Sequence, residues 1–78
     1  MLSYMFIEDF EIRSYSKTEL ARLYNPQVSD AAARRLLRQW IVYNEQLKKE
    51  LGMLGTPKHA HIFSPRQVET IVKYLGTP

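Results

Sequence analysis

Three arginines gather on one side of a helix in the middle of this 78-residue chain. Arg34, Arg35 and Arg38 are spaced so that a helix places them, together with Gln39, on the surface opposite its apolar stripe. Guanidinium groups suit phosphate oxygens and guanine edges, and a glutamine amide suits adenine. The pattern favours a nucleic-acid-binding face. The alternative is an ordinary solvated helix surface, because arginine is also a good helix former.

The helix that carries these arginines must be positioned by elements with their own start and stop signals. We expect it to begin after Ser29, which is a favourable N-cap residue. A shorter helix from Lys17 to about Tyr24 precedes it, and Pro26 ends that helix. A further helix covers residues 65–75. The buried stripe of the arginine helix is predicted to be Ala33, Leu36, Leu37, Trp40 and Ile41.

One capping signal occurs twice in the chain. An aromatic residue and a serine are followed, three residues after the serine, by Glu19 in the first copy and by Gln67 in the second. This spacing is typical of a capping box with a hydrophobic staple. An extended segment precedes each copy, at residues 10–15 and 58–63, and these two short strands can pair as a small wing. Asn44 either caps an additional helix over residues 45–51 or lies within a continuous helix.

These elements predict an α+β, mostly helical fold: a winged-helix-like helix-turn-helix with a small two- or three-stranded sheet. Residues 10–78 form a single domain, and residues 1–9 form an N-terminal leader that is apolar and then acidic. With 45% hydrophobic residues the chain is too apolar to be disordered. It has no cysteine, which excludes disulfides and thiolate metal sites.

Charge and motif content restrict the possible functions. All 11 Lys and Arg residues lie from Arg13 onward, and only five of the eight acidic residues lie there, which permits binding to a polyanion. There is no glycine-rich phosphate loop and no Ser/His/Asp arrangement, so we expect no enzyme, no cofactor and no small-molecule substrate. His59 and His61 alternate on a strand without a third ligand, so we expect no metal site. The short apolar start is neither a signal peptide nor a membrane span, which predicts a cytoplasmic protein without a membrane partner.

Two segments carry a resemblance to known proteins. Residues 13–26, RSYSKTELARLYNP, and residues 63–78, FSPRQVETIVKYLGTP, resemble a family of short bacterial proteins defined only as a domain of unknown function. The similarity covers residues 10–78 and implies no particular activity.

A looser resemblance is carried by Thr18-Glu-Leu-Ala21, Val28-Ser29 and Phe63-Ser64. Their order is similar to that in the winged helix-turn-helix of mercury-resistance-type regulators and excisionases. This resemblance implies that the three arginines contact DNA from a recognition helix and that Lys58 contacts it from a wing.

We therefore predict a DNA-binding protein with an accessory or regulatory role and double-stranded DNA as its partner. The expected contact residues are Arg34, Arg35, Arg38, Gln39, Lys17 and Lys58. The alternative prediction is a protein-interaction module or small homodimer that binds no nucleic acid. It would use residues 2–7 and the helical extension over residues 44–51 as its contact surface.

Overall fold

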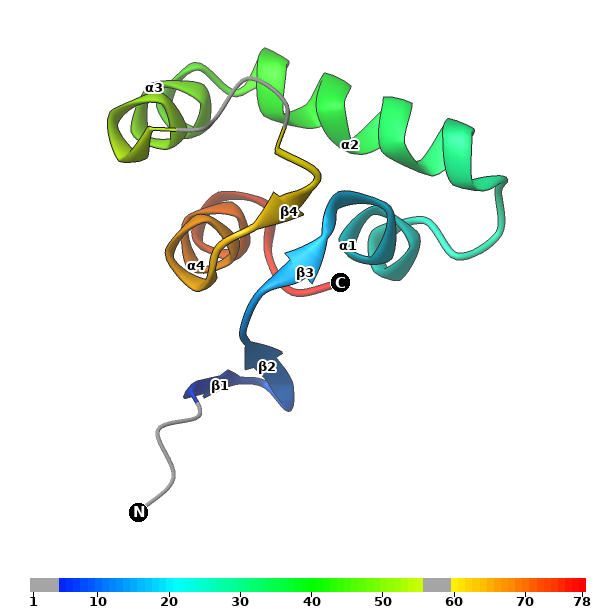
Figure 1. The fold of residues 1–78 in the computed structure, drawn as a ribbon, viewed down its shortest axis with the longest axis horizontal. Helices are drawn as coiled ribbons and strands as arrows, with labels where there is room; N and C mark the ends of the chain where they lie inside the picture. Colours follow the sequence, from blue (N-terminus) through cyan, green and yellow to red (C-terminus); the bar gives the residue numbers. More distant parts are fainter. Residues whose placement is uncertain (1–4, 56–59) are drawn as a thin grey trace.

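The computed structural model describes residues 5–55 and 60–78. Over these residues the chain forms four helices and two small antiparallel sheets (Figure 1), so the mostly helical α+β class is confirmed. In chain order the elements are β1 (Met5–Ile7), β2 (Phe10–Ile12), β3 (Tyr15–Ser16), α1 (Lys17–Tyr24), α2 (Asp30–Tyr43), α3 (Glu45–Leu54), β4 (Ile62–Phe63) and α4 (Pro65–Leu75).

Each of these four helices begins at a polar cap. Ser16, Ser29 and Ser64 cap α1, α2 and α4, and the hydroxyl of each accepts a hydrogen bond from the backbone amide three residues later, at 2.9, 3.2 and 3.2 Å. Asn44 caps α3 in the same way, with its Oδ1 3.0 Å from the amide nitrogen of Leu47. Because the backbone of Asn44 is extended, it also ends α2. The separate additional helix is therefore the alternative that forms, and it continues to Leu54.

The strands that precede α1 and α4 pair with each other as predicted, but over fewer residues than expected, because residues 10–12 of the predicted strand 10–15 pair with β1 instead. Tyr15 lies opposite Phe63, and Ser16 lies opposite Ile62, in an antiparallel arrangement. The backbone amide of Lys17 extends this contact by donating to the carbonyl oxygen of residue 61 at 2.8 Å. The described part of the second strand is only two residues long, and Lys58 lies outside the described residues.

Strands β1 and β2 form a hairpin that leads into β3 (Figure 1). Its two-residue turn consists of Glu8 and Asp9, whose φ angles are 52° and 70°. Positive φ at both turn positions matches the twist that a two-residue hairpin requires. The carboxylate of Glu8 accepts a hydrogen bond from Thr77 Oγ1 at 3.0 Å, which links the turn to the C-terminal residues. Residues 5–9 of the predicted leader thus belong to a hairpin with β2.

The hydrophobic core lies where the helices meet. Leu20, Leu47, Val68 and Ile71, one from each of α1 and α3 and two from α4, are completely buried. Helix α2 packs against α1 and α3 and reaches the core through two buried side chains. The remaining buried hydrophobic residues are Ile12, Tyr15, Ala21, Ala33, Leu37, Phe63 and Val72.

Trp40 departs from its predicted place in the buried stripe of α2. It is 38% exposed and packs edge-on against Tyr24, with ring centroids 6.0 Å apart. The reason is that α2 contacts the core along a narrow line through Ala33 and Leu37, so that residues at the edge of the stripe lie outside it.

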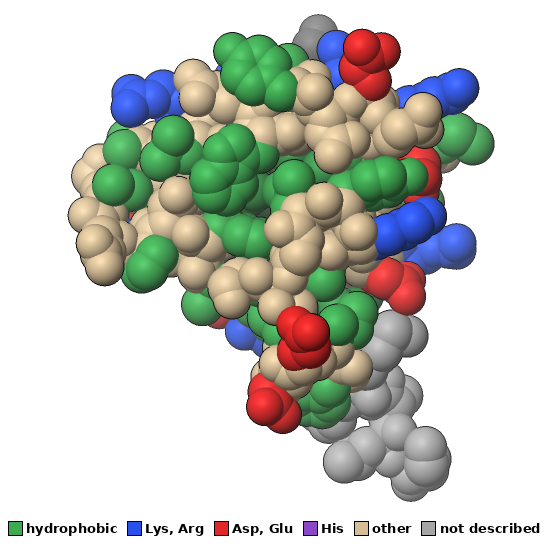
Figure 2. All heavy atoms as spheres, turned by 180° about the vertical axis from the view of Figure 1, so that it is seen from behind, with side chains coloured by type: hydrophobic (Ala, Val, Ile, Leu, Met, Phe, Trp, Pro, Cys, Tyr) green, Lys and Arg blue, Asp and Glu red, His purple; other side chains and the backbone are tan. Residues whose placement is uncertain are grey.

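On the face turned away from the viewer in Figure 1, hydrophobic side chains gather over the middle and Lys and Arg lie toward the edges (Figure 2).

The turn between α1 and α2 fixes where α2 lies. The guanidinium group of Arg22 donates to the carbonyl oxygen of Val28 and lies 3.5 Å from the carboxylate of Asp30. The hydroxyl of Tyr24 donates to the carbonyl oxygen of Gly76 at 2.6 Å, and burial raises the pKa of Tyr24 to about 12. The start of α2 and the end of α1 are therefore tied to each other and to the C-terminal residues.

Candidate nucleic-acid interface

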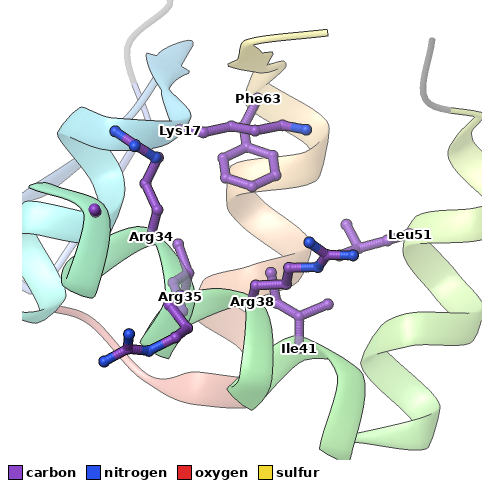
Figure 3. A pocket seen from close by; sticks show the side chains of 9 residues that line it. Lys17, Arg34, Arg35, Arg38, Ile41, Leu51 and Phe63 are labelled. Carbon is purple, nitrogen blue, oxygen red and sulfur yellow. The ribbon is translucent and has the colours of Figure 1, made fainter. Parts of the chain in front are cut away.

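An open groove of about 710 Å³ runs along one side of α2 (Figure 3). Helix α2 forms one wall, and α1, α3 and β4 contribute the remaining lining. Four of its nine lining residues carry a positive charge and none is acidic, so the groove attracts anions. The lining residues are Lys17, Ala31, Arg34, Arg35, Leu37, Arg38, Ile41, Leu51 and Phe63.

The first turn of α1 and the middle of α2 meet at one end of this groove. Lys17 is the first residue of α1, and its ammonium nitrogen lies 5.5 Å from the centre of the Phe63 ring. Arg34 reaches from α2 to the same turn, where its Nη1 donates to Thr18 Oγ1 at 2.9 Å. This bond fixes the direction of the Arg34 guanidinium group, whereas the Lys17 side chain extends over the Phe63 ring (Figure 3).

Arg35 and Arg38 extend the positive charge along α2. Both side chains are exposed. In residues 5–55 and 60–78, the ion pairs within 4 Å join carboxylates to Arg13, Arg22 and Lys73, and none involves a cation of the groove. The charges of Lys17 and the three arginines are therefore available to an anionic ligand.

The floor of the groove is apolar. Leu37 and Phe63 are buried, and Ile41 and Leu51 are half-buried beside them. An apolar floor keeps water and its high dielectric constant away from one side of the cations, which strengthens their attraction for an anion. Sequence reasoning missed this floor: it placed Phe63 as a staple for α4 and Leu51 as the end of a helical extension.

The structure places the predicted contact residues in three groups. Lys17, Arg34, Arg35 and Arg38 come together in the groove. Gln39 is exposed and follows Arg35 by one turn of α2, outside the residues that line the groove. Lys58 lies outside the described residues.

The arginines were predicted to lie on the surface of α2 opposite its apolar stripe. They are exposed as expected, but they line a groove whose other side is formed by α1, α3 and β4. Ala33 and Leu37 direct α2 toward the core, and at about 100° per residue Arg34 and Arg38 point about 100° and 140° from Ala33. That direction is the flank of the helix, where neighbouring elements reach up beside it.

The described part of the chain holds neither a membrane-spanning helix nor a group of three potential metal ligands. None of its helices has the length and apolarity needed to cross a membrane. Within the same residues, no three His, Asp or Glu side chains are grouped as ligands for a metal ion, and His59 lies outside them.

A sequence profile described as a domain of unknown function, DUF4248, matches residues 11–78. No curated protein and no solved structure matches the chain. The profile match covers all four helices and every residue that lines the groove. It confirms the predicted membership of a family of unknown function, and it leaves the resemblance to winged helix-turn-helix regulators a prediction.

Proposed function

The chain belongs to the DUF4248 family, and we propose that it is a DNA-binding protein with an accessory or regulatory role that holds DNA in the basic groove beside α2. The observation that carries the proposal is the lining of this groove. Four cations from two helices line it, no acidic residue lines it, and no ion pair of the described residues neutralises them.

A nucleic-acid backbone suits this arrangement better than a small anion does. The groove is open, and its cations are spread along more than one turn of α2, so a single phosphate would leave most of them unused. A phosphodiester chain presents a negative charge at every nucleotide and can contact several cations at once. Guanidinium groups also bind phosphate oxygens through two parallel hydrogen bonds.

The groove suggests a division of roles among the contact residues. Lys17, Arg34 and Arg38 would bind phosphate oxygens. The hydrogen bond to Thr18 already fixes the direction of the Arg34 guanidinium group. Arg35 and Gln39 lie one turn apart toward the outer side of α2 and are the candidates for contacts to base edges in the major groove. Lys58 would add a backbone contact.

The proposal is tested by measuring the affinity for a fluorescent DNA duplex at several salt concentrations. If the four proposed phosphate contacts, Lys17, Arg34, Arg38 and Lys58, each neutralise one phosphate, the plot of log affinity against log salt should have a slope of about −3.6. The triple variant Arg34→Ala/Arg35→Ala/Arg38→Ala should bind much more weakly, with a slope of about −1.8, because only Lys17 and Lys58 remain as phosphate contacts.

The matched control removes three positive charges away from the groove. Lys48, Lys49 and Arg66 are exposed and do not line it, so Lys48→Ala/Lys49→Ala/Arg66→Ala changes the net charge equally and should largely retain binding. Circular dichroism verifies that both variants fold. Failure of the natural protein to bind the duplex at low salt would refute the proposal, as would equal losses in the two triple variants.

The alternative of a protein-interaction module stays a prediction, but the surface first expected for it is only partly available. In the helical extension, Leu47 is buried in the core and Leu51 faces the groove. An apolar surface that is open to a partner lies instead on the other side of α2.

A further inference from the structure

Helix α2 has a second exposed face, which we call the aromatic stripe. It consists of Ala32, Leu36, Trp40 and Tyr43, spaced four, four and three residues apart. At about 100° per residue these side chains point about 260° to 340° around the helix from Ala33, whereas Arg34 and Arg38 point about 100° and 140° from it. The aromatic stripe and the basic groove therefore occupy opposite flanks of the same helix.

The stripe is apolar and partly exposed to water. Tyr43 is 80% exposed and Trp40 is 38% exposed, while Leu36 and Ala32 are half-buried. Tyrosine and tryptophan are the residues most enriched at the centres of protein–protein interfaces, because they bury a large area and lose little conformational freedom. A row of such side chains on one helix flank points to a docking surface.

We propose that the aromatic stripe is the interface of a two-fold homodimer in which α2 packs antiparallel against α2 of a second copy. A two-fold interface brings a surface against itself, so it must be compatible with its own charge. The four side chains of the stripe are uncharged and meet this condition. The opposite flank, with Arg34 and Arg38, would repel itself.

The sizes of the side chains favour the antiparallel arrangement. Leu36 and Trp40 each lie two residues from residue 38 along α2. A two-fold axis at the level of residue 38 therefore packs Leu36 of one copy against Trp40 of the other. The same axis brings the small Ala32 close to the large Tyr43 of the second copy. In a parallel pair Ala32 would face Ala32 and Tyr43 would face Tyr43, which leaves a gap at one end and crowding at the other.

The arrangement also determines where the two grooves lie. Because each groove is on the flank of α2 that faces away from the stripe, the dimer carries its two grooves on opposite sides. It would thus hold two separate DNA segments, one on each side. This consequence rests on the proposed function, whereas the dimer itself does not.

Light scattering on the full chain tests the dimer. We expect a mass of twice the 9.2 kDa of one chain. We expect Tyr43→Glu to weaken the dimer about 30-fold or more, because it places a carboxylate against Ala32 at both ends of the interface. The control is Val42→Glu. Val42 is 44% exposed and adjacent in sequence but points toward the basic flank, so this variant adds the same charge at the same end of α2 and should remain a dimer.

The outcomes separate the dimer from the DNA proposal. A monomeric natural protein at the highest soluble concentration, or equal effects of the two substitutions in variants that melt like the natural protein, would overturn the interface. Two duplexes with different labels then test the groove arrangement: the natural protein should capture both together, and Tyr43→Glu should bind each without joining them. A stable dimer that binds DNA but never joins two duplexes would refute the placement of the grooves.

Discussion

The starts of α1 and α4 carry the same sequence signal, but the structure uses it differently at each. At α4 the capping box is complete: Ser64 Oγ accepts from the Gln67 amide at 3.2 Å, and Gln67 Oε1 accepts from the Ser64 amide at 2.8 Å. At α1 the Ser16 hydroxyl makes its half of the box, whereas the Glu19 carboxylate accepts from Arg13 Nη2 at 2.9 Å. The side chain at the third helical position therefore binds whichever donor nearby is strongest.

Charge explains the difference. A carboxylate attracts a guanidinium group more strongly than it attracts a backbone amide, and the hydrogen bond to Glu19 is the main cause that raises the pKa of Arg13. Arg13 is held at this point because its guanidinium carbon lies 3.7 Å from the centre of the Tyr15 ring. Gln67 is neutral and only 5% exposed, so the backbone amide of Ser64 remains the partner of its carbonyl oxygen.

The largest effect expected from this comparison comes from removing the buried glutamine. Gln67→Ala should lower the free energy of unfolding by about 1–3 kcal/mol, because it leaves the partly buried amide of Ser64 without its acceptor. Glu19→Ala should cost less than about 1 kcal/mol, because its ion pair is exposed to solvent. Urea unfolding followed by circular dichroism measures both. Equal losses would mean that burial does not distinguish the two helix starts.

Much of the helical structure could be predicted from the sequence because its signals are local. The α1 and α4 bounds follow from a serine cap, an apolar repeat and a stop at Pro26 or Gly76, and all of these act within a few residues. Local signals could not decide whether Asn44 caps an additional helix or lies within a continuous one. The choice depended on Leu47 turning into the core, which is a tertiary contact.

The candidate site was predictable only in part for the same reason. Helix periodicity places the arginines of α2 on one side, so their grouping was accessible from the sequence. Periodicity gives a direction around a helix but does not say what lies beside it. Leu51 and Phe63 are distant in sequence from Lys17 and become its neighbours only when α3 and β4 fold beside α2.

A second substitution, Tyr15→Phe, gives both helix starts the same aromatic residue before the serine cap. The Tyr15 hydroxyl donates to the carbonyl oxygen of Glu11 at 2.8 Å, whereas Phe63, its strand partner, has no hydroxyl. Tyr15→Phe should therefore lower the free energy of unfolding by about 0.5–1.5 kcal/mol at neutral pH. Thermal unfolding at a fixed pH gives the difference.

The same substitution should change the response to alkali. Burial raises the pKa of Tyr15 above its ordinary value of 10, so above about pH 10 the folded state keeps a proton that the unfolded state loses. This contribution to stability is complete below pH 10 and declines as the pH rises above it. The natural protein should therefore lose part of its stability advantage over Tyr15→Phe as the pH rises above 10. The raised pKa of Tyr24 lowers the stability of both proteins in this range and leaves their difference unaffected. Parallel stability curves through this range would contradict the assignment.

The smallest expected effect comes from giving the start of α1 the residue found at α4. Glu19→Gln removes the ion pair with Arg13 and supplies the neutral amide that closes the box at α4. We expect a net change within about 0.5 kcal/mol, because an exposed ion pair contributes little and the new amide can accept from the Ser16 backbone. The stability of the variant should also respond less to added salt, which screens exposed charges.

Glu45→Gln is the control for this substitution. Glu45 lies in the first turn of α3, is exposed, and takes part in no ion pair among the described residues, so it measures the loss of a favourable charge at a helix N-terminus alone. If Glu19→Gln destabilises the protein by clearly more than Glu45→Gln, the pair with Arg13 stabilises the start of α1 more than a closed box does. If the two variants behave alike, the two helix starts differ in which bonds they make but not in the stability that those bonds provide.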